Sequence, residues 1–366
     1  MGFRCGIVGL PNVGKSTLFN ALTETAAAAA ANYPFCTIEP NVGNVPVPDP
    51  RLAQIAAIAH SAKIIETQLG FTDIAGLVRG ASKGEGLGNQ FLGNIRETDA
   101  IVHVLRCFED DDVTHVEGRI DPVSDADTVE TELMLADLDS LEKRVPALAK
   151  KATQGDKEAK VGAAVLGQAL ELLRAGKPAR LTVPAGEDEA RVFAQAQLLT
   201  AKPVLYVCNV EEASAAEGNA LSRAVAVKAA AEGARSVVIS AAIEAEISQM
   251  DAADRPDFLA ELGLTETGLT RVVRAGYDLL QLITFFTAGP KETRAWTIER
   301  GFKAPAAAGV IHSDFEKKFI RAETIAFDDF VRLNGEAGAR DAGRLRMEGK
   351  EYIVADGDVL NFLHGA

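Results

Sequence analysis

Short, nearly continuous apolar runs recur along the chain and are separated by longer amphipathic stretches. The clearest runs lie at 5–8, 69–76, 100–108, 203–208 and 236–239. Strands that are covered on both faces by helices have this continuous apolar character, whereas strands with one wet face alternate. The pattern therefore predicts an α/β fold built on a doubly wound, mostly parallel sheet.

A long helical pattern interrupts this arrangement between 128 and about 174. In its outgoing half, apolar residues alternate between spacings of four and three, which is the period of a coiled-coil seam. The outgoing set is Met134, Leu138, Leu141, Val145 and Leu148, and the returning set is Val161, Val165, Leu166, Leu170 and Leu173. With a turn at 153–156, the two sets predict an inserted antiparallel coiled-coil hairpin at 128–199.

Beyond Gly276 the pattern changes to short strands separated by turn residues. The predicted strands are 282–286, 294–298, 327–333, 352–354 and 359–362, with a helix-like stretch at 313–321. This mixture indicates a small, separate α+β domain at 279–366. Residues 1–127 and 200–278 are then left to form the domain that contains the parallel sheet.

Composition narrows the class of protein. The chain has 366 residues, of which 47% are hydrophobic and 25% charged, as in globular proteins of two or three domains. No apolar run reaches the ~18–20 residues of a membrane span, so we expect a cytoplasmic protein without a membrane partner. A net charge of −14 argues against general nucleic-acid binding, DNA included, but leaves room for local basic patches.

The strand at 5–8 leads into a glycine-rich loop. Residues 9–17 read GLPNVGKST and match the pattern G-x-x-x-x-G-K-[ST] of a phosphate-binding loop. In such a P-loop, backbone N–H groups and Lys15 hold the phosphates, and the Ser16 hydroxyl ligates Mg²⁺. The helix predicted after it adds its positive N-terminal end to the same site. The residues predicted to bind nucleotide here are Asn12, Val13, Gly14, Lys15, Ser16 and Thr17.

Two further segments fit an ion and a phosphate beside this loop. An alanine run at 26–31 among small residues predicts an irregular segment, in which Thr37 would complete the Mg²⁺ shell. Asp73 opens a D-x-x-G pattern, which places its carboxylate near Mg²⁺ and the Gly76 N–H near the γ-phosphate. The next residue, Leu77, has no hydrogen-bonding group to orient water. Hydrolysis would therefore need another group, a partner or an ion.

The strand at 203–208 is followed by the residues NVEE at 209–212. Guanine-binding proteins carry N-K-x-D there, and the Asp accepts hydrogen bonds from the guanine N1 and N2 groups. Here Val210 replaces the Lys and Glu212 replaces the Asp, which favours ATP because adenine lacks the groups that the Asp reads. The predicted base contacts are Asn209, Val210, Glu212 and Ser240.

His115 is a candidate for the missing catalytic group. It follows an acidic cluster at 109–112, just beyond a strand end, where the loops of parallel sheets meet ligands. Histidine is the commonest general base but is also common on surfaces, so both interpretations stay open on the residues alone. His103 lies mid-strand and is interpreted as a buried structural histidine.

Basic side chains gather in two places. The hairpin set is Lys143, Arg144, Lys150, Lys151, Lys157 and Lys160, and the C-terminal set is Lys291, Arg294, Arg300, Lys303, Lys317, Lys318 and Arg321. A solvated charged face and a contact for RNA are both open interpretations of the hairpin set. The excess of bases over nearby acids favours contact with RNA for the C-terminal set.

Together these features resemble the YchF or Obg-like ATPases, a family of Obg-related P-loop proteins. The resemblance covers essentially the whole chain and rests on 9–17, 73–92, 106–118, the NVEE residues, and the terminal stretches DFEKKFIRAET and DGDVLNFL. It implies hydrolysis of ATP in preference to GTP, association with ribosomes, and a C-terminal ubiquitin-like domain of the TGS type.

The resemblance also implies roles for single residues. The family lacks the catalytic Gln, as at Leu77, and its histidine implicated in hydrolysis falls on His115. Asn12 is similar to the asparagine with which related P-loop proteins place a K⁺ ion, a cation able to substitute for an arginine finger.

The sequence thus predicts a ribosome-associated, Mg²⁺-dependent and K⁺-stimulated ATPase whose binding to ribosomes or translation components is switched by the nucleotide. The predicted catalytic residues are Lys15, Gly76 and His115, and the predicted metal ligands are Ser16, Thr37 and Asp73. Two alternatives stay open. One is a switch in which slow hydrolysis acts only as a timer, and the other is a GTP-dependent switch with slow intrinsic turnover.

Overall fold

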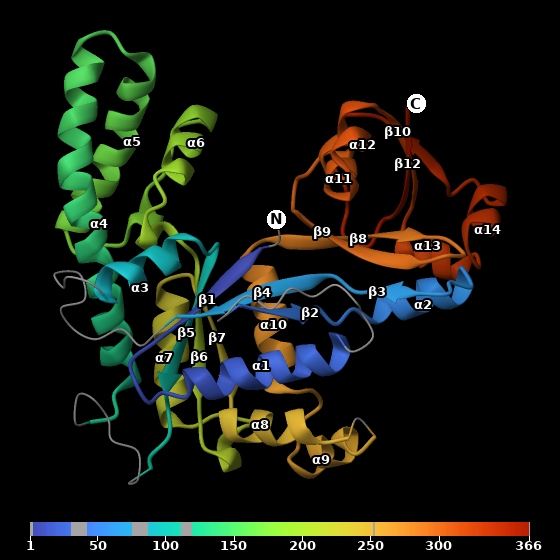
Figure 1. The fold of residues 1–366 in the computed structure, drawn as a ribbon, viewed down its shortest axis with the longest axis horizontal. Helices are drawn as coiled ribbons and strands as arrows, with labels where there is room; N and C mark the ends of the chain where they lie inside the picture. Colours follow the sequence, from blue (N-terminus) through green and yellow to red (C-terminus); the bar gives the residue numbers. More distant parts are fainter. Residues whose placement is uncertain (1–2, 31–41, 75–86, 111–118, 252, 366) are drawn as a thin grey trace. The chain divides into compact units, whose positions relative to one another are not determined.

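The computed structural model describes residues 3–30, 42–74, 87–110, 119–251 and 253–365 (Figure 1). Its contacts divide the chain into two compact units. The first unit comprises Met1–Val45 and Gly70–Gly276, and the second comprises Pro46–Leu69 and Tyr277–Ala366. This division groups the predicted hairpin at 128–199 with the first unit and places Pro46–Leu69 with the C-terminal residues and not with 1–127. The last boundary falls after Gly276, close to the predicted boundary after 278. Among the described residues, no helix is long and apolar enough to cross a membrane.

The described part of the first unit is built on a six-stranded sheet in the order β2-β4-β1-β5-β6-β7. Its strands are β1 (Arg4–Val8), β2 (Val42–Pro46), β4 (Gln68–Asp73), β5 (Ala100–Arg106), β6 (Val204–Asn209) and β7 (Arg235–Ile239). β1 pairs in parallel with β4 and β5, and β6 pairs in parallel with β5 and β7. All residues of β5 are buried, as expected of a central strand covered on both faces. The predicted α/β fold with a mostly parallel sheet is confirmed.

Helices follow the strands of this sheet. They are α1 (Lys15–Ala30), α3 (Leu87–Arg96), α7 (Ala220–Ala231), α8 (Ala241–Gln249), α9 (Arg255–Glu261) and α10 (Gly268–Leu279). α1 packs against α8 and continues through Ala30, so the prediction of an irregular segment from 26 onward is wrong for its first five residues. A helix that is already nucleated at the P-loop propagates easily through alanine, which has the highest helix propensity.

Two long helices, α4 (Pro122–Thr153) and α5 (Lys157–Arg174), form a hairpin (Figure 1). Asp121 and Asp156 cap their N-termini, each accepting a hydrogen bond from a backbone N–H two or three residues into the helix. α4 starts earlier than 128 because Asp121 and Pro122 form a strong helix start. The described hydrophobic cluster between the helices contains all five outgoing seam residues and, from the returning set, Val165, Leu166, Leu170 and Leu173.

Asp137 anchors this hairpin to the chain that returns to the sheet. Its buried carboxylate accepts hydrogen bonds from the backbone N–H groups of Leu199 at 2.9 Å and Thr200 at 2.8 Å, and from the Thr200 hydroxyl at 2.7 Å. Burial raises the pKa of Asp137, while these hydrogen bonds and the charge of Arg96 act in the opposite direction. The carboxylate therefore supplies the acceptors for two buried backbone N–H groups and one buried hydroxyl.

The second unit has its own sheet, which in the described residues runs β11-β10-β12-β8-β9-β3. The strands are β3 (Ile64–Ile65), β8 (Leu282–Ala288), β9 (Thr293–Glu299), β10 (Phe319–Ile325), β11 (Arg346–Glu348) and β12 (Val359–His364). The helices are α2 (Pro50–Ile58), α11 (Ala304–Ile311), α12 (Ser313–Lys317), α13 (Phe327–Arg332) and α14 (Glu336–Asp341). An α+β composition of this part of the chain, as predicted, is what the structure shows.

Three local predictions in this unit are wrong. Residues 327–332 form helix α13 and not a strand, because Asp328 and Asp329 favour a helix N-terminus and the apolar residues Phe327, Phe330 and Leu333 pack against the core at helical spacing. Residues 352–354 make only one isolated bridge, between Ile353 and Lys303. The helix-like stretch at 313–321 ends at Lys317 and passes into β10, whose alternation the preceding charges concealed.

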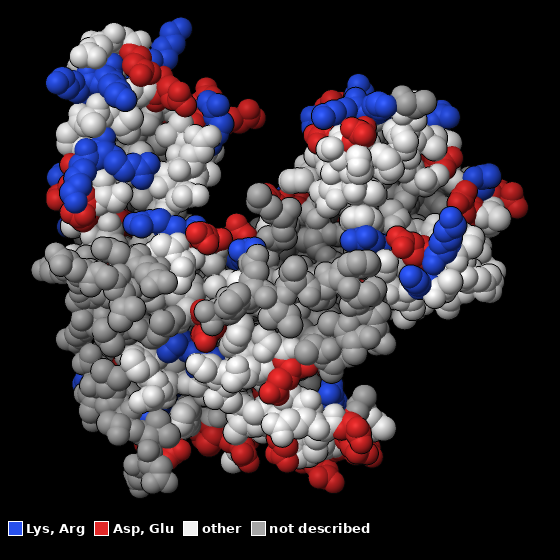
Figure 2. Space-filling model, in the orientation of Figure 1, with Lys and Arg blue, Asp and Glu red and all other residues white. Residues whose placement is uncertain are grey.

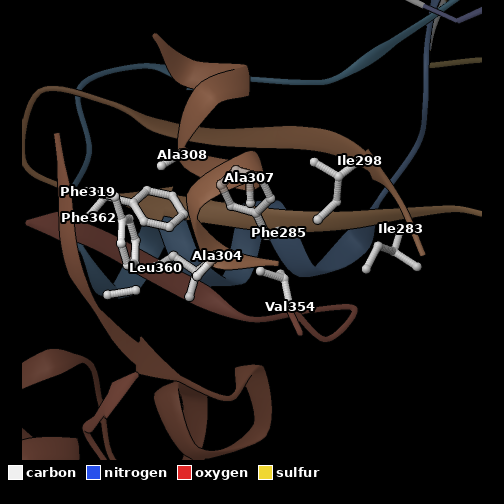
Figure 3. Packing of buried hydrophobic residues seen from close by; sticks show 11 residues of the cluster. Ile283, Phe285, Ile298, Ala304, Ala307, Ala308, Phe319, Val354, Leu360 and Phe362 are labelled. Atoms are coloured by element: carbon white, nitrogen blue, oxygen red, sulfur yellow. The ribbon is translucent and has the colours of Figure 1, made fainter. Parts of the chain in front are cut away.

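The core of this unit forms where α11 lies against the sheet (Figure 3). Phe285 of β8 and Phe362 of β12 meet edge to face with ring centroids 5.8 Å apart. The fully buried residues that α11 presents to this cluster are all small, namely Ala304, Ala307 and Ala308. Small residues allow the helix to approach the aromatic layer closely, which accounts for the dense packing.

Arg51 explains why the segment 46–69 groups with the C-terminal residues. Its guanidinium pairs with the carboxylates of Asp49 at 2.7 Å and Asp356 at 2.8 Å and lies over the Phe286 ring at 5.3 Å. Next to it, Leu52 and Ile55 of α2 are buried in a cluster with residues of β8, β9, β10 and β12. Both contacts are built between residues that are far apart along the chain.

Asp137→Ala is expected to lower the free energy of unfolding by about 2–4 kcal/mol, because it leaves two buried backbone N–H groups without an acceptor. Urea denaturation followed by circular dichroism measures the change. Asp139→Ala is the matched control, since Asp139 lies on the same helix, is exposed, and forms its one ion pair within the described part of the chain with the exposed Lys143. The control should change stability by at most about 0.5 kcal/mol. Equal losses in both variants would contradict the anchoring role of Asp137.

Candidate nucleotide-binding site

The P-loop joins β1 to α1 and has the backbone that its glycines allow. Gly9 and Gly14 have φ angles of +154° and +96°, and Asn12 has a left-handed φ of 62°. A Cβ at position 9 would lie 2.5 Å from the Val104 carbonyl oxygen, and one at position 14 would lie 2.4 Å from Asn209 Nδ2. The loop is therefore held close to the ends of β5 and β6, with no space for larger residues.

Lys15 is buried at the start of α1, and its Nζ donates a hydrogen bond to the Leu10 carbonyl oxygen at 2.7 Å. Burial lowers the pKa of Lys15 to about 8, and the charge of Asp73 acts in the opposite direction. The ammonium group thus lies on the inner side of the P-loop and bonds to the opposite arm of the loop at Leu10. A phosphate held by the loop would meet a cation that is only weakly hydrated and strongly attracted to it.

Ser16 and Asp73 supply oxygen atoms of the kind that Mg²⁺ prefers. Ser16 is exposed on the first turn of α1. Asp73 ends β4 and lies opposite Ile7 of β1, which leads into the P-loop. Burial raises the pKa of Asp73 and the charge of Lys15 lowers it, so the two groups lie within electrostatic reach of each other. This donor set fits a Mg²⁺ ion bound together with a nucleotide phosphate.

Several predicted site residues lie outside the described part of the chain. They are Thr37, Gly76 and His115, and Leu77 lies outside it as well. His103 is described and is fully buried in β5, where burial first and then the charges of Lys15 and Lys228 lower its pKa to about 3. A neutral imidazole in a central strand matches the structural interpretation of His103.

Asn209 fixes the P-loop relative to the neighbouring strands. Its Nδ2 donates to the Val13 carbonyl oxygen at 3.0 Å, and its Oδ1 accepts from the Ala241 N–H at 2.9 Å. Both ends of the buried amide are thereby engaged by the protein backbone. Asn209 was predicted to contact the base, and the structure gives it a different set of contacts, between the P-loop and the start of α8.

A cavity of about 690 Å³ opens beside the P-loop, a size typical of small-molecule sites. It is lined by Asn12, Gly14, Thr17, Phe108, Glu109, Asp110, Asn209, Val210, Glu211, Glu212, Ser240, Ala241 and Ala242. All four predicted base contacts are among these residues. Ser240 is 2% exposed, and its hydroxyl has no hydrogen-bond partner among the described residues. A buried hydroxyl without a partner at a cavity wall is available to a polar ligand.

The two adjacent glutamates of the NVEE stretch differ in their surroundings. Glu211 accepts hydrogen bonds from the Ser214 hydroxyl and from Asn219 Nδ2. Burial raises the pKa of Glu211, but these hydrogen bonds outweigh it and the net shift is downward. The Glu212 side chain has no such partner among the described residues. The structure thus leaves Glu212 free for a ligand and uses Glu211 internally.

Sequence reasoning did not assign the segment after β5 to the cavity. Phe108, Glu109 and Asp110 line it, and the buried Arg106 donates to the carbonyl oxygens of Phe108 at 3.1 Å and Asp110 at 3.0 Å. The signal is the position of this segment at the carboxyl edge of a central strand, where ligands bind in open α/β sheets. That position supports the prediction for His115 and applies equally to residues 108–110.

Comparison with known proteins places this site in a family. Residues 4–137 match the family model MMR_HSR1, described as "50S ribosome-binding GTPase", and residues 282–364 match YchF-GTPase_C, described as "Protein of unknown function (DUF933)". A protein from Haemophilus influenzae is 57% identical over 362 residues, which is 99% of each chain. The chain belongs to the YchF family.

Other relatives of this YchF-family chain agree with that assignment. The Haemophilus protein and a Bacillus subtilis protein, 51% identical over 99% of each chain, both carry the name "Ribosome-binding ATPase YchF". The solved structure of the Schizosaccharomyces pombe YchF GTPase is 35% identical, with a TM-score of 0.88 over 99% of this chain and 98% of its own. A GTP-binding protein from Pyrococcus horikoshii, 19% identical with a TM-score of 0.64, shares the fold.

Gly14→Ala is expected to weaken nucleotide binding at least tenfold, or about 1.4 kcal/mol, because the added Cβ would collide with Asn209 at a left-handed φ. Titration with a fluorescent ATP analogue measures the dissociation constant. Gly167→Ala is the control, since a Cβ at that position in α5 meets no atom within 4 Å. A folded Gly14→Ala variant with unchanged affinity would show that the P-loop does not need this close approach.

Proposed function

We propose that this YchF-family protein hydrolyses ATP to ADP and phosphate and binds ribosomes. The observation that carries the proposal is the cavity beside the P-loop, in which Val210 and Glu212 take the places of a guanine-reading Lys and Asp. The Glu212 carboxylate has no partner among the residues that the structure describes. The names of full-length relatives at 51–57% identity support the same activity and partner.

The proposed mechanism is in-line attack of water on the γ-phosphate. Ser16, Thr37 and Asp73 would hold a Mg²⁺ ion, which together with Lys15 would neutralise the charge on the phosphates. The Gly76 N–H would donate a hydrogen bond to the γ-phosphate. We propose that His115 orients the attacking water, directly or through a loop movement. Asn12, with its left-handed backbone, is the proposed contact for a K⁺ ion that supplies additional positive charge.

Names alone do not decide the base, because relatives are called both ATPase and GTPase. The argument for ATP comes from the residues. Val210 is 2% exposed and offers no charged stem over the base, while Glu212 is one methylene longer than the Asp that reads guanine. The Ser240 hydroxyl provides a polar contact that does not depend on guanine groups.

The proposed ribosome contact is built on basic side chains. Figure 2 shows Lys and Arg gathered at the free end of the hairpin and over the α12 region of the second unit. In the predicted hairpin set every residue except Arg144 is exposed, and in the predicted C-terminal set every residue except Arg294 is exposed. In a chain with a net charge of −14, such local basic surfaces fit contact with ribosomal RNA.

A ribosome as partner fits the expected cytoplasmic location of the protein. We also propose that the second unit is a TGS-like domain.

A molecular switch that uses slow hydrolysis as a timer is the alternative account of the same site. The two accounts differ in whether ribosomes strongly accelerate a nearly absent intrinsic turnover.

Direct titration with ATP and GTP tests the proposed base preference. The wild-type protein should bind ATP at least about tenfold more tightly than GTP. Glu212→Asp, which restores the length of the guanine-reading carboxylate, should narrow that ratio about fivefold or more. Glu217→Asp is the control outside the cavity and should leave the ratio unchanged. Tighter binding of GTP by the wild type would overturn the ATP assignment.

His115→Ala tests the proposed orientation of water. Turnover should fall by roughly 10²-fold or more, the usual contribution of a positioned acid–base group, while ATP affinity stays within about twofold. Steady-state phosphate release and ATP titration measure the two quantities. His60→Ala, in the second unit, provides a histidine control. Equal turnover in wild type and His115→Ala would remove His115 from the mechanism.

A further inference from the structure

The cavity has two walls that follow adjacent strands. One wall is 108–110, after β5, and the other is 211–212, after β6. The pairing of these strands ends at Arg106 and Asn209, followed by one hydrogen bond from Cys107 N–H to the Asn209 carbonyl oxygen at 2.7 Å. Beyond this point the strand ladder no longer fixes the distance between the walls.

Arg106 shapes the first wall. Its guanidinium is almost completely buried, donates to the carbonyl oxygens of Phe108 and Asp110, and lies 4.7 Å from the centre of the Phe108 ring. These contacts fix the backbone of residues 108–110 against the buried guanidinium. A connection between the two walls is made by another residue.

Asn219 makes that connection. Its side-chain Nδ2 donates to the Cys107 carbonyl oxygen at 2.6 Å and to Glu211 Oε2 at 2.9 Å. Its Oδ1 accepts from the Ser222 N–H at 3.0 Å, which caps the N-terminus of α7. One amide thus joins the segment after β5, the segment after β6 and the start of a helix.

The same contact determines which glutamate remains available. One carboxylate oxygen of Glu211 is held by Asn219 and the other by Ser214. Glu212 is the neighbouring carboxylate at the cavity and has no partner of this kind among the described residues. Without the Asn219 amide, Glu211 would lose one of its two anchors and a second carboxylate would be free at the wall.

We propose that Asn219 is a positioning residue for nucleotide recognition, which sets the distance between the walls 108–110 and 211–212 and keeps Glu211 away from the base. The inference rests on the proposed binding of ATP in this cavity. Asn219 acts at the end of the cavity where the predicted base contacts Val210 and Glu212 lie. It therefore affects nucleotide affinity and base preference and not the transfer of the phosphate.

A purely structural role predicts a different result. As helix N-caps, Asn, Asp and Ser are nearly equivalent, so a capping role alone leaves Asn219→Ser and Asn219→Asp close to wild type. If Asn219 instead connects the two walls, then of these three residue types only Asn has an N–H₂ group that reaches both the Cys107 carbonyl oxygen and Glu211 Oε2. Ser is too short to reach both acceptors, and Asp would place a carboxylate against the Cys107 carbonyl oxygen and the Glu211 carboxylate.

The experiment measures binding of ATP and GTP, and turnover at saturating ATP, for the full chain carrying Asn219→Ser or Asn219→Asp. The ATP dissociation constant should rise about fivefold in Asn219→Ser and at least about tenfold in Asn219→Asp. The preference for ATP over GTP should shrink in the same order. Turnover at saturation should stay within about twofold, because the P-loop and its metal ligands are untouched.

Ser222→Ala is the matched control. It removes the reciprocal half of the capping box, in which the Asn219 N–H donates to Ser222 Oγ at 2.8 Å, but leaves the Asn219 amide in place. This variant should lose melting temperature and keep its ATP affinity. If Ser222→Ala loses affinity as much as Asn219→Asp, the effect belongs to the helix start and the inference is overturned.

The remaining outcomes separate this inference from the proposed function. Wild-type protein that binds no ATP would overturn the proposed function itself. Wild-type protein that binds ATP, with both Asn219 variants equal to it in affinity and base preference, would overturn the role of Asn219 alone. A fall in turnover without a change in affinity would also contradict a positioning role at the base.

Discussion

The buried amide of Asn209 is the interaction on which the nucleotide site depends. It joins the P-loop, the end of β6 and the first residue of α8 through two hydrogen bonds to backbone groups. Either backbone group left without a partner in this buried place would cost about 1–3 kcal/mol. The close approach of the amide also excludes any side chain at position 14, so the glycine of the motif and the asparagine of β6 require each other. The same asparagine therefore fixes the position of the P-loop relative to the wall that contains the predicted base contacts.

The strongly patterned parts of the fold could be predicted from the sequence, because their pattern reports burial directly. β5 is buried along its whole length, and the hairpin seam repeats over several turns. The second unit was harder, since its elements are short and the aromatic residues of 327–333 suit a strand and a helix equally well. Helix α2 could not be assigned to that unit at all, because its partners come much later in the chain, as the contact between Arg51 and Asp356, 305 positions apart, illustrates.

The candidate site divides in the same way. Residues of a motif, such as Lys15, Ser16 and Asp73, are recognisable because the motif encodes local geometry. Asn219 is not, because its contact with Cys107 spans 112 positions and its local sequence reports only a helix start. Arg106 reads as one more charged residue at a strand end, and its burial appears only when the loop after it is folded over the guanidinium. Such contacts depend on tertiary packing and produce no hydrophobic periodicity, so they could not be predicted from the sequence.

The placement of Pro46–Leu69 in the second unit has a practical consequence for dissecting the protein. The chain passes between the two units three times, after Val45, after Leu69 and after Gly276. Each passage falls inside a regular element, namely β2, β4 and α10. A gene fragment that stops at 276 would therefore produce a first unit with an orphaned α2, exposing Leu52 and Ile55 to water. The second unit is accordingly not a detachable tail, and separating the two would require circular permutation or a replacement for residues 46–69, not truncation.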